Sequence, residues 1–207
     1  MPDNISSLIA EIEEEQTLEA VREALSRETD PLSLVAALRD GVAVVGERFE
    51  SKEYFLPELI MAGEIFKEAI NLIDPYLKGE TSDSRGTVVV GTVQGDIHDI
   101  GKNLVVTMLR CNAFEVHDLG IDVAPEAFVE KVRETGARLV GMSGLLTLAF
   151  DAMKNTVEAL EEAGLRDRTK IIIGGGPINE TVLKYCRADA YGKDPTEAVR
   201  LANSYLG

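Results

Sequence analysis

The pattern of apolar positions divides the chain into two halves of different texture. In the first half no β-like run stands out, and apolar residues recur every three or four positions, as on one face of an α-helix. The clearest stripe predicts a helix from Pro31 to about Phe49, with Asp30 as its N-cap. The stripe consists of Leu34, Val35, Leu38, Val42, Val45 and Phe49.

Further helices are predicted on either side of this one. Thr17 is the candidate cap of a helix that runs to about Arg27, and another helix begins near Pro57. Four helices joined by short turns form a small antiparallel bundle, so we expect residues 1–80 to be a helical bundle domain. Residues 81–86 are small and polar, which predicts a domain linker.

From residue 87 onward, short β-branched or apolar runs alternate with amphipathic helices. Strands buried on both faces give continuous apolar runs, and this alternation is typical of a doubly wound parallel sheet. Residues 87–207 are therefore predicted to form an α/β domain of flavodoxin-like, Rossmann-like type with five parallel strands. The expected strands are 87–93, 115–119, 139–143, 170–173 and 188–191, and the expected helices are 101–112, 125–135, 149–163, 179–185 and one that begins at 195.

Composition and charge exclude several classes of function. A formal net charge of -15 would be repelled by nucleic acid and by an anionic membrane, so neither is an expected partner. No apolar run approaches the roughly 20 residues of a membrane span. The stretch from Met1 to Glu15 is acidic, unlike a secretory signal, and we expect a cytoplasmic protein. Cys111 and Cys186 have no CxxC partner, which indicates buried thiols.

Unusual chemistry gathers after three of the predicted strands, at the ends where sheets of this kind bind ligands. The first strand is followed by Gly95-Asp96-Ile97-His98-Asp99-Ile100-Gly101, which we call the histidine segment. The third strand is followed by Ser143-Gly144-Leu145, and the fourth by Gly174-Gly175-Gly176. We expect these three segments to build one site.

Familiar interpretations of these segments fail on spacing. Five residues rather than four separate Gly95 from Gly101, and Asn103 stands where a Walker A loop needs Ser or Thr for magnesium. The glycines after the fourth strand lack the GxGxxG pattern of dinucleotide-binding folds. A tetrahedral zinc site needs several nitrogen or sulfur ligands, and the chain has only His98 and His117. We expect His117 to be structural.

What remains is one histidine with a carboxylate two residues before it. Side chains two positions apart on an extended segment share an edge, so Asp96 can accept the Nδ1 proton of His98 and leave Nε2 as an oriented donor. One protein ligand suffices for a metal that a tetrapyrrole-type macrocycle already holds. For these residues alone, a loop histidine with a purely structural role stays an open alternative.

The intervals between the segments resemble the signature of cobalamin-binding domains. Asp96-x-His98-x-x-Gly101 is followed after 41 residues by Ser143-x-Leu145 and after another 28 by Gly174-Gly175. The helical half is similar to the cap domain of methyl-carrying corrinoid proteins and of cobalamin-dependent methionine synthase. Its similar stretches are Gly46-Glu47-Arg48-Phe49 and Tyr54-Phe55-Leu56-Pro57-Glu58-Leu59-Ile60. The resemblance therefore covers nearly the whole chain.

The resemblance implies roles for the matching residues. His98 would be the lower axial ligand of cobalt in a cobalamin or related corrinoid bound base-off, with Asp96 as its hydrogen-bonded partner. Ser143 and Leu145 would line the slot for the displaced nucleotide tail. The glycines would let the loops approach the cofactor closely. The other residues assigned to the cofactor site are Gly95, Ile97, Asp99, Ile100, Gly101, Thr147, Gly174 and Gly175.

The cap and one departure from the family pattern complete the expected site. Phe49 and Leu56 match the residues that shield the upper face of cobalt, with Leu59 beside them, although periodicity alone makes all three core positions. In methionine synthases a serine extends the Asp-His pair into a proton relay, and here that position is Ala149. Thr147 is the nearest hydroxyl in the sequence.

The function that the resemblance implies is that of a corrinoid methyl carrier, a component of a methyltransferase system and not a catalyst on its own. A donor-specific methyltransferase would load the methyl group, and a second would pass it to a pterin or thiol acceptor. A reductive activator is a further expected partner. The donor stays open among methanol, methylamines, betaines and aryl methyl ethers. The alternatives are a cobalamin-responsive regulator, which the acidic charge opposes, and the small subunit of a radical mutase, which would resemble the second half alone.

Overall fold

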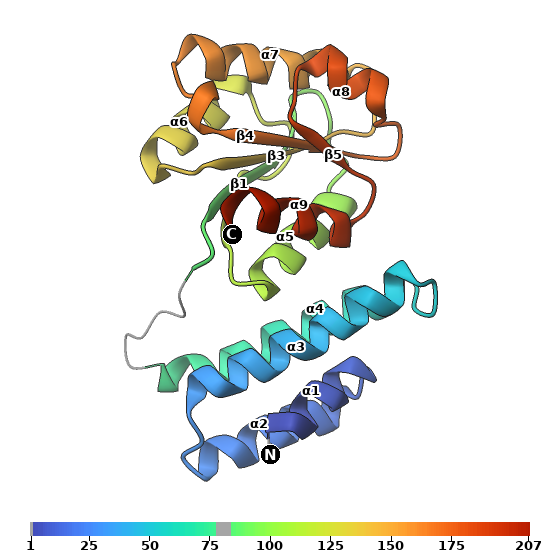
Figure 1. The fold of residues 1–207 in the computed structure, drawn as a ribbon, viewed down its shortest axis with the longest axis vertical. Helices are drawn as coiled ribbons and strands as arrows, with labels where there is room; N and C mark the ends of the chain where they lie inside the picture. Colours follow the sequence, from blue (N-terminus) through green and yellow to red (C-terminus); the bar gives the residue numbers. More distant parts are fainter. Residues whose placement is uncertain (1, 78–83) are drawn as a thin grey trace. The chain divides into compact units, whose positions relative to one another are not determined.

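The protein divides into two compact units. A computed structural model describes residues 2–77 and 84–207. The units are Met1–Asp83, the helical unit, and Ser84–Gly207, the α/β unit (Figure 1). Of the predicted linker 81–86, residues 81–83 lie outside the described residues, so the linker stays a prediction.

The described part of the helical unit is a bundle of four α-helices, as predicted. They are α1 (Pro2–Ala10), α2 (Glu14–Ser26), α3 (Pro31–Glu50) and α4 (Leu56–Ile73), and a short 3-10 helix, η1 (Asp74–Tyr76), follows. Helix α3 packs against α1 and α4, and α2 packs against the same two helices. Fully buried apolar side chains such as Ile9, Leu34 and Leu38 fill the space between them.

Two helix starts test the predicted capping. Asp30 caps α3, because its side chain accepts a hydrogen bond from the N–H of Ser33 at 2.9 Å. The prediction that Thr17 caps α2 is wrong, since α2 begins at Glu14 and Thr17 is buried inside it. The Thr17 hydroxyl donates to the carbonyl of Glu13 at 2.6 Å, the bond that a threonine within a helix makes to the preceding turn.

The α/β unit contains a five-stranded, all-parallel sheet with the order β2-β1-β3-β4-β5, which confirms the flavodoxin-like prediction. The strands are β1 (Thr87–Thr92), β2 (Glu115–Asp118), β3 (Leu139–Ser143), β4 (Lys170–Gly174) and β5 (Ala190–Gly192). The helices are α5 (Ile100–Cys111), α6 (Pro125–Thr135), α7 (Ala149–Glu162), α8 (Glu180–Cys186) and α9 (Pro195–Leu206), with the 3-10 helix η2 (Arg166–Arg168).

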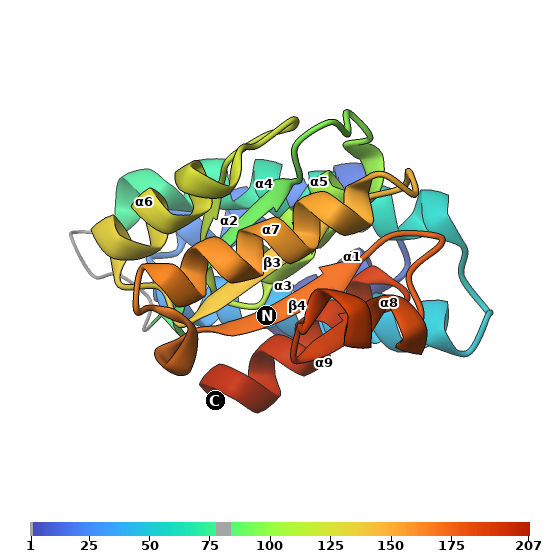
Figure 2. The same cartoon turned by 90° about the horizontal axis from the view of Figure 1, so that it is seen from above.

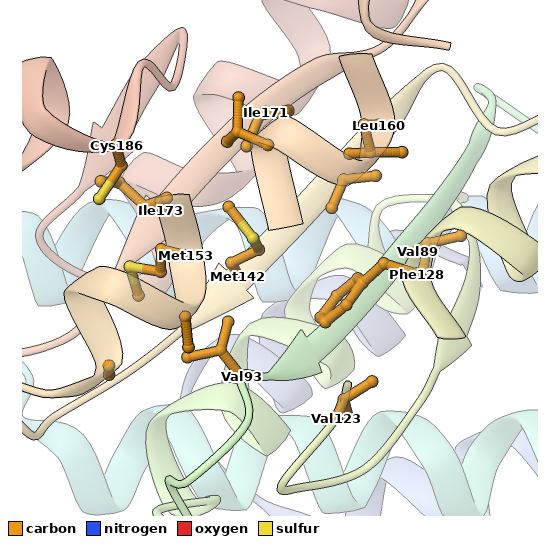
Figure 3. Packing of buried hydrophobic residues seen from close by; sticks show 14 of the residues in the cluster. Val89, Val93, Val123, Phe128, Met142, Met153, Leu160, Ile171, Ile173 and Cys186 are labelled. Atoms are coloured by element: carbon orange, nitrogen blue, oxygen red, sulfur yellow. The ribbon is translucent and has the colours of Figure 1, made fainter. Parts of the chain in front are cut away.

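Helices cover both faces of this sheet. Figure 1 shows α6, α7 and α8 on one face and α5 and α9 on the other, and Figure 2 shows α7 lying over β3. Between the sheet and the first group of helices, Val89, Phe128, Met142, Met153 and Ile173 pack into a common core (Figure 3). Because side chains alternate between the faces of a strand, the neighbouring strand positions point toward α5 and α9.

Two smaller predictions concern the cysteines and the membrane. Cys111 and Cys186 are both buried, as predicted. Burial raises the pKa of the Cys186 thiol to about 11, so this group stays protonated at neutral pH. Within residues 2–77 and 84–207, the helices are too short or too polar to cross a bilayer.

Candidate functional site

The histidine segment lies at the topological switch point of the sheet. Strand β1 is flanked by β2 on one side and β3 on the other, and the chain leaves β1 for α5 on one face and β3 for α7 on the opposite face (Figure 1). A crevice opens between such diverging loops at the carboxyl ends of the strands. The histidine segment and the segment Ser143-Gly144-Leu145 are these two loops, so the fold brings them together as predicted.

Three hydrogen bonds hold His98. Its ring Nδ1 lies 2.7 Å from Oδ1 of Asp96, and its backbone N–H donates to the same oxygen at 3.0 Å. Its carbonyl accepts a hydrogen bond from Oγ1 of Thr92 at 3.0 Å. Among the described residues, Nε2 has no hydrogen-bond partner, and 48% of the side chain is exposed. His98 therefore presents one ring nitrogen outward in a fixed orientation.

Asp96 is fully buried and accepts four hydrogen bonds. Two come from His98 to Oδ1, and the backbone N–H groups of Leu145 and Leu146 donate to Oδ2 at 2.6 and 3.0 Å. Burial alone would raise the pKa of this carboxyl, but the hydrogen bonds from the three backbone N–H groups and the His98 ring outweigh it and hold the pKa well below its usual range. Asp96 is thus an anion at neutral pH, and Nδ1 of His98 donates its proton to it.

Among the described residues, no side-chain hydroxyl is hydrogen-bonded to Asp96. Ala149 is buried and carries no hydroxyl, and the exposed Thr147 makes no hydrogen bond to Asp96 within the described part of the chain. Both donors to Oδ2 are backbone N–H groups, so within the described residues the bonds of Asp96 continue to no side chain other than His98.

The loop after β2 supports the histidine segment from the other side. Oδ1 of Asp122 accepts a hydrogen bond from the N–H of Gly95 at 2.7 Å, and the N–H of Asp122 donates to the carbonyl of Asp96 at 3.0 Å. Gly95 has a φ of +82°, a conformation that favours glycine. The sequence analysis missed Asp122, although its place just beyond a strand end is the signal that selected the other three segments.

A cavity of about 230 Å³ opens beside the histidine segment, on the face covered by α5 and α9. Ser143, Gly174 and Gly175 line it, together with Gly101 from the first turn of α5. Leu145 does not line it; its exposed side chain lies near Gly176, where an added Cβ would be 3.3 Å from Leu145 Cδ1. Three of the predicted tail-binding residues therefore share one cavity, and Leu145 stands at its edge.

Glycines keep this cavity open. An added Cβ at Gly101 would meet no heavy atom within 4 Å, and at Gly174 the nearest atom would be 3.5 Å away, so packing does not demand glycine at either position. A side chain there would instead narrow the cavity. Gly175 differs, because its φ is +136° and an added Cβ would lie 2.0 Å from the carbonyl oxygen of Gly144. Here the backbones of the loops after β3 and β4 touch.

An ion pair between Lys102, which lines the same cavity, and Asp118, whose side chain is 25% exposed, lies beside the histidine segment. The ammonium of Lys102 is 2.7 and 2.6 Å from the two carboxylate oxygens of Asp118, and the lysine side chain is 3% exposed. An opposite charge at hydrogen-bond distance offsets part of the cost of burying the ammonium group. The pair ties the first turn of α5 to the end of β2 and so fixes one wall of the cavity.

Large apolar side chains are exposed on the three loops around His98. Ile97 and Ile100 of the histidine segment are 68% and 72% exposed. The whole group, which we call the apolar rim, consists of Ile97, Ile100, Ile121, Leu145, Leu146 and Leu148. Exposed apolar side chains gathered at the functional end of a fold indicate a binding surface.

In the helical unit, the predicted cap residues differ in exposure. Phe49 is half-buried, Leu56 is exposed and Leu59 is fully buried in the bundle. Leu56 belongs to an apolar patch at the start of α4 that the sequence analysis recognised only in part. The patch consists of Phe55, Leu56, Ile60 and Met61. Leu59, which lies between these residues in the sequence, is buried in the core of the bundle.

Arg48 and Tyr54 anchor the loop that precedes this patch. Arg48 donates to the carbonyl of Ala10 at 3.0 Å, to the hydroxyl of Tyr54 at 2.7 Å and to the carboxylate of Glu11 at 2.8 Å. The Tyr54 hydroxyl donates to the same carbonyl of Ala10 at 3.0 Å. These bonds tie the ends of α1 and α3 to the turn before α4, which explains why the two residues occur together in the cap-like stretches.

Comparison with known protein families identifies the family of this chain. A family model described as a B12 binding domain matches residues 86–200, and a second model with the same description matches residues 3–73. The chain belongs to the B12-binding corrinoid proteins. Its cofactor is a corrinoid, as the resemblance to cobalamin-binding domains implied.

Individual relatives of this corrinoid protein agree over almost its whole length. Dimethylamine corrinoid protein 3 of Methanosarcina acetivorans is 36% identical over 98% of this chain and 95% of its own length. A cobalamin-binding protein from Desulfitobacterium hafniense DCB-2 is 39% identical, with a TM-score of 0.82 over 100% of this chain and 99% of that one. In the methanol:cobalamin methyltransferase complex of Methanosarcina barkeri, one chain is 30% identical, with a TM-score of 0.87 over 98% of this chain and 78% of that one.

The residues present fit a corrinoid. No cluster of three or more His, Cys, Asp or Glu side chains able to hold a metal occurs within residues 2–77 and 84–207, whereas one oriented histidine suits a metal that brings its other ligands with it. The apolar rim offers a surface for the face of a large ring. The glycine-lined cavity leaves room beside the histidine segment for a further part of the cofactor.

Proposed function

We propose that this corrinoid protein is the methyl carrier of a methyltransferase system and that Nε2 of His98 is the lower axial ligand of its cobalt. The observation that carries the proposal is the fixed orientation of His98, in which Asp96 and Thr92 occupy every other polar group of the residue. Bound in this way, the cofactor supplies a cobalt that accepts a methyl group and gives it up again.

The cavity supports a base-off arrangement of the cofactor. If the histidine replaces the nucleotide base on cobalt, the displaced tail needs a place of its own. Ser143, Gly101, Gly174 and Gly175 line a cavity beside the histidine segment. Two of these glycines are not required by packing, which supports a role in leaving space for a ligand. We assign the nucleotide tail to this cavity.

The apolar patch of the helical unit is the proposed shield for the methyl group. Phe49 and Leu56 carry the resemblance to cap domains, and Phe55, Ile60 and Met61 add exposed apolar surface next to Leu56. Apolar side chains exclude water from the group that they cover. The patch must also move aside for a partner enzyme, because a covered methyl group cannot be transferred.

Two methyltransferases are the proposed partners. One would load the methyl group from a small donor, and the other would pass it to a pterin or thiol acceptor, with a reductive activator to restore the cofactor after oxidation. The names of the relatives point to dimethylamine and to methanol as donors of their own systems. For this chain the donor is set by the partner, and methylamines, methanol, betaines and aryl methyl ethers are the candidates.

The decisive experiment is reconstitution of the full chain with hydroxocobalamin, followed by visible spectra of the wild type and of His98→Ala. We expect the wild-type spectrum to be that of histidine-ligated cobalamin without its own base, and the variant to lose that ligation. His117→Ala is the matched control and should leave the spectrum unchanged. Identical spectra for the wild type and His98→Ala would refute the assignment of His98.

A methylation assay tests the carrier role separately. The reconstituted protein, reduced and supplied with a methyltransferase encoded beside it, should take up a methyl group from one of the candidate donors. Loss of that uptake in His98→Ala, with the helical content of the protein unchanged, is the expected result. Failure of every donor and enzyme pair to methylate the protein, in a sample with correct ligation, would favour the regulator over the carrier.

A further inference from the structure

We propose that Thr92 is a positioning residue for His98 and that its hydroxyl holds the histidine in the orientation in which Nε2 meets cobalt. This inference rests on the proposed function, in which His98 is the cobalt ligand. Thr92 lies outside the histidine segment, at the last position of β1, and belongs to none of the motifs that identified the site.

The backbone of Thr92 is fixed by the neighbouring loop. Its N–H donates to the carbonyl of Gly120 at 3.0 Å, and its carbonyl accepts from the N–H of Val123 at 3.0 Å. The residue is fully buried. With both backbone groups bonded and χ1 restricted by the branched side chain, Oγ1 has a set position relative to the sheet. The donor to His98 is therefore part of the rigid framework of the α/β unit.

The other two bonds of His98 do not fix the residue by themselves. Its backbone N–H and its Nδ1 both go to Oδ1 of Asp96, so they converge on one atom. Two hydrogen bonds to the same atom still allow the residue to rotate about that atom. The bond from Thr92 reaches the carbonyl of His98, on another side of the residue and from another element, and removes that rotation. Thr92 thus completes the orientation that Asp96 begins.

The same bond also satisfies the buried hydroxyl of Thr92, as any buried hydroxyl requires. A control is needed to separate this ordinary benefit from an effect on His98. Thr156 provides it, because it is fully buried in the same unit and its Oγ1 donates to the carbonyl of Ala152 at 2.8 Å within α7. Removing either hydroxyl deletes one buried bond to a backbone carbonyl, but only Thr92 is bonded to the cobalt ligand.

The experiment compares Thr92→Val, Thr92→Ser and Thr156→Val in the full chain reconstituted with hydroxocobalamin. The readouts are the fraction of histidine-ligated cobalt in the visible spectrum and the dissociation constant for cobalamin. Thr92→Val should weaken ligation about three- to tenfold, the worth of one hydrogen bond. Thr92→Ser keeps the hydroxyl and should restore ligation to near the wild-type level, and Thr156→Val should leave it unchanged.

The same substitutions in a His98→Ala background show whether Thr92 acts through the histidine. We expect Thr92→Val to have no effect on cobalamin affinity there, so that the two changes are not additive. Equal weakening in both backgrounds, or ligation in Thr92→Val equal to that of the wild type, would overturn the proposal. If Thr92→Val does not fold, Thr92→Ala and Thr92→Ser, which differ by one oxygen, give the same comparison.

Failure of this inference is distinguishable from failure of the proposed function. If His98→Ala leaves the spectrum unchanged, His98 is not the cobalt ligand and the proposed function is refuted. A spectrum that His98→Ala changes, with no selective effect of Thr92→Val, keeps His98 as the ligand and refutes only the role of Thr92.

Discussion

The helical unit and the α/β unit hold their candidate residues in different ways. In the α/β unit, single polar atoms of His98, Asp96 and Thr92 are held at hydrogen-bond distances by backbone groups from several loops. In the helical unit, Leu56 and its neighbours form an apolar patch without such bonds between their side chains. The charge is equally uneven, since residues 1–83 hold 19 acidic and 7 basic side chains, against 17 and 14 in residues 84–207.

This difference predicts how each unit responds to amino-acid substitution. A site built from hydrogen bonds depends on individual atoms, so the loss of one oxygen or the addition of one methyl group changes its geometry. An apolar patch depends on its area, and its exposed members tolerate truncation as long as the core beneath them is intact. Substitutions should therefore give sharply position-dependent effects in the α/β unit and burial-dependent effects in the helical unit.

The largest effect is expected for Gly175→Ala. The new Cβ would lie 2.0 Å from the carbonyl oxygen of Gly144, and the φ of +136° strains any side chain. We expect the free energy of unfolding to fall by at least about 3 kcal/mol, measured by urea denaturation. Gly101→Ala is the matched control, because its Cβ meets nothing within 4 Å. Gly101→Ala should keep its stability and bind cobalamin more weakly, since it narrows the cavity. Equal stability of the two variants would contradict the close contact between Gly175 and Gly144.

A loss of the same order or smaller is expected for Leu59→Ala in the helical unit. Leu59 is fully buried, and truncation of a buried leucine costs about 2 to 5 kcal/mol of unfolding free energy. Leu56→Ala is the matched control. Because Leu56 is 44% exposed, its truncation should change the free energy of unfolding by no more than about 0.5 kcal/mol. If the exposed leucine proves as costly as the buried one in thermal or urea unfolding, Leu56 is part of a core and not of a free patch.

The smallest effect is expected for the contribution of Asp96 to the pH dependence of the free energy of unfolding. Its pKa is lower in the folded protein than in the unfolded chain, so its ionised form stabilises the fold at neutral pH. That stabilisation is full above the unfolded-state value of about 4 and is lost as the pH falls through the folded-state value. Asp96→Asn should lower the unfolding free energy by about 1 to 2 kcal/mol at pH 7, and the gap should close on acidification.

Urea denaturation at several pH values between neutrality and about pH 3 measures this gap. Asp99→Asn is the control, because Asp99 is exposed and next to the same histidine, and it should show no comparable closing of the gap. A difference between Asp96→Asn and the wild type that stays constant over this range would show that the carboxylate charge does not contribute.

Most of the fold, and within the site the contact between Asp96 and His98, were predictable from the sequence. The strands at the centre of the α/β unit are continuous apolar runs, the pattern that burial on both faces of a sheet produces. The contact between Asp96 and His98 follows from their spacing on an extended segment. The start of α2 was predicted wrongly at Thr17. A threonine hydroxyl can cap the start of a helix, but it can also bond to the preceding turn from a position inside the helix, as Thr17 does. Local residue type does not distinguish the two uses.

The remaining parts of the site lack a signal in residue type. The N–H groups of Leu145 and Leu146 that bind Asp96 are backbone donors, which every residue except proline has. Leu56 and Leu59 have the same side chain three positions apart, and only the packed bundle shows that one is exposed and the other buried. Thr92 has the residue type of an ordinary strand position, and only the folded loop shows that its hydroxyl meets His98.

The contact between Gly175 and Gly144 also makes the site mechanically continuous. The N–H of Gly144 donates to the carbonyl of Gly174 at 3.0 Å, and the next residue along, Leu145, donates to Asp96. The backbone of Gly174 at the cavity and the carboxylate of Asp96 are therefore hydrogen-bonded to two consecutive residues, Gly144 and Leu145. A substitution at the cavity that displaced Gly174 would therefore also displace a hydrogen-bond donor to the carboxylate that holds His98.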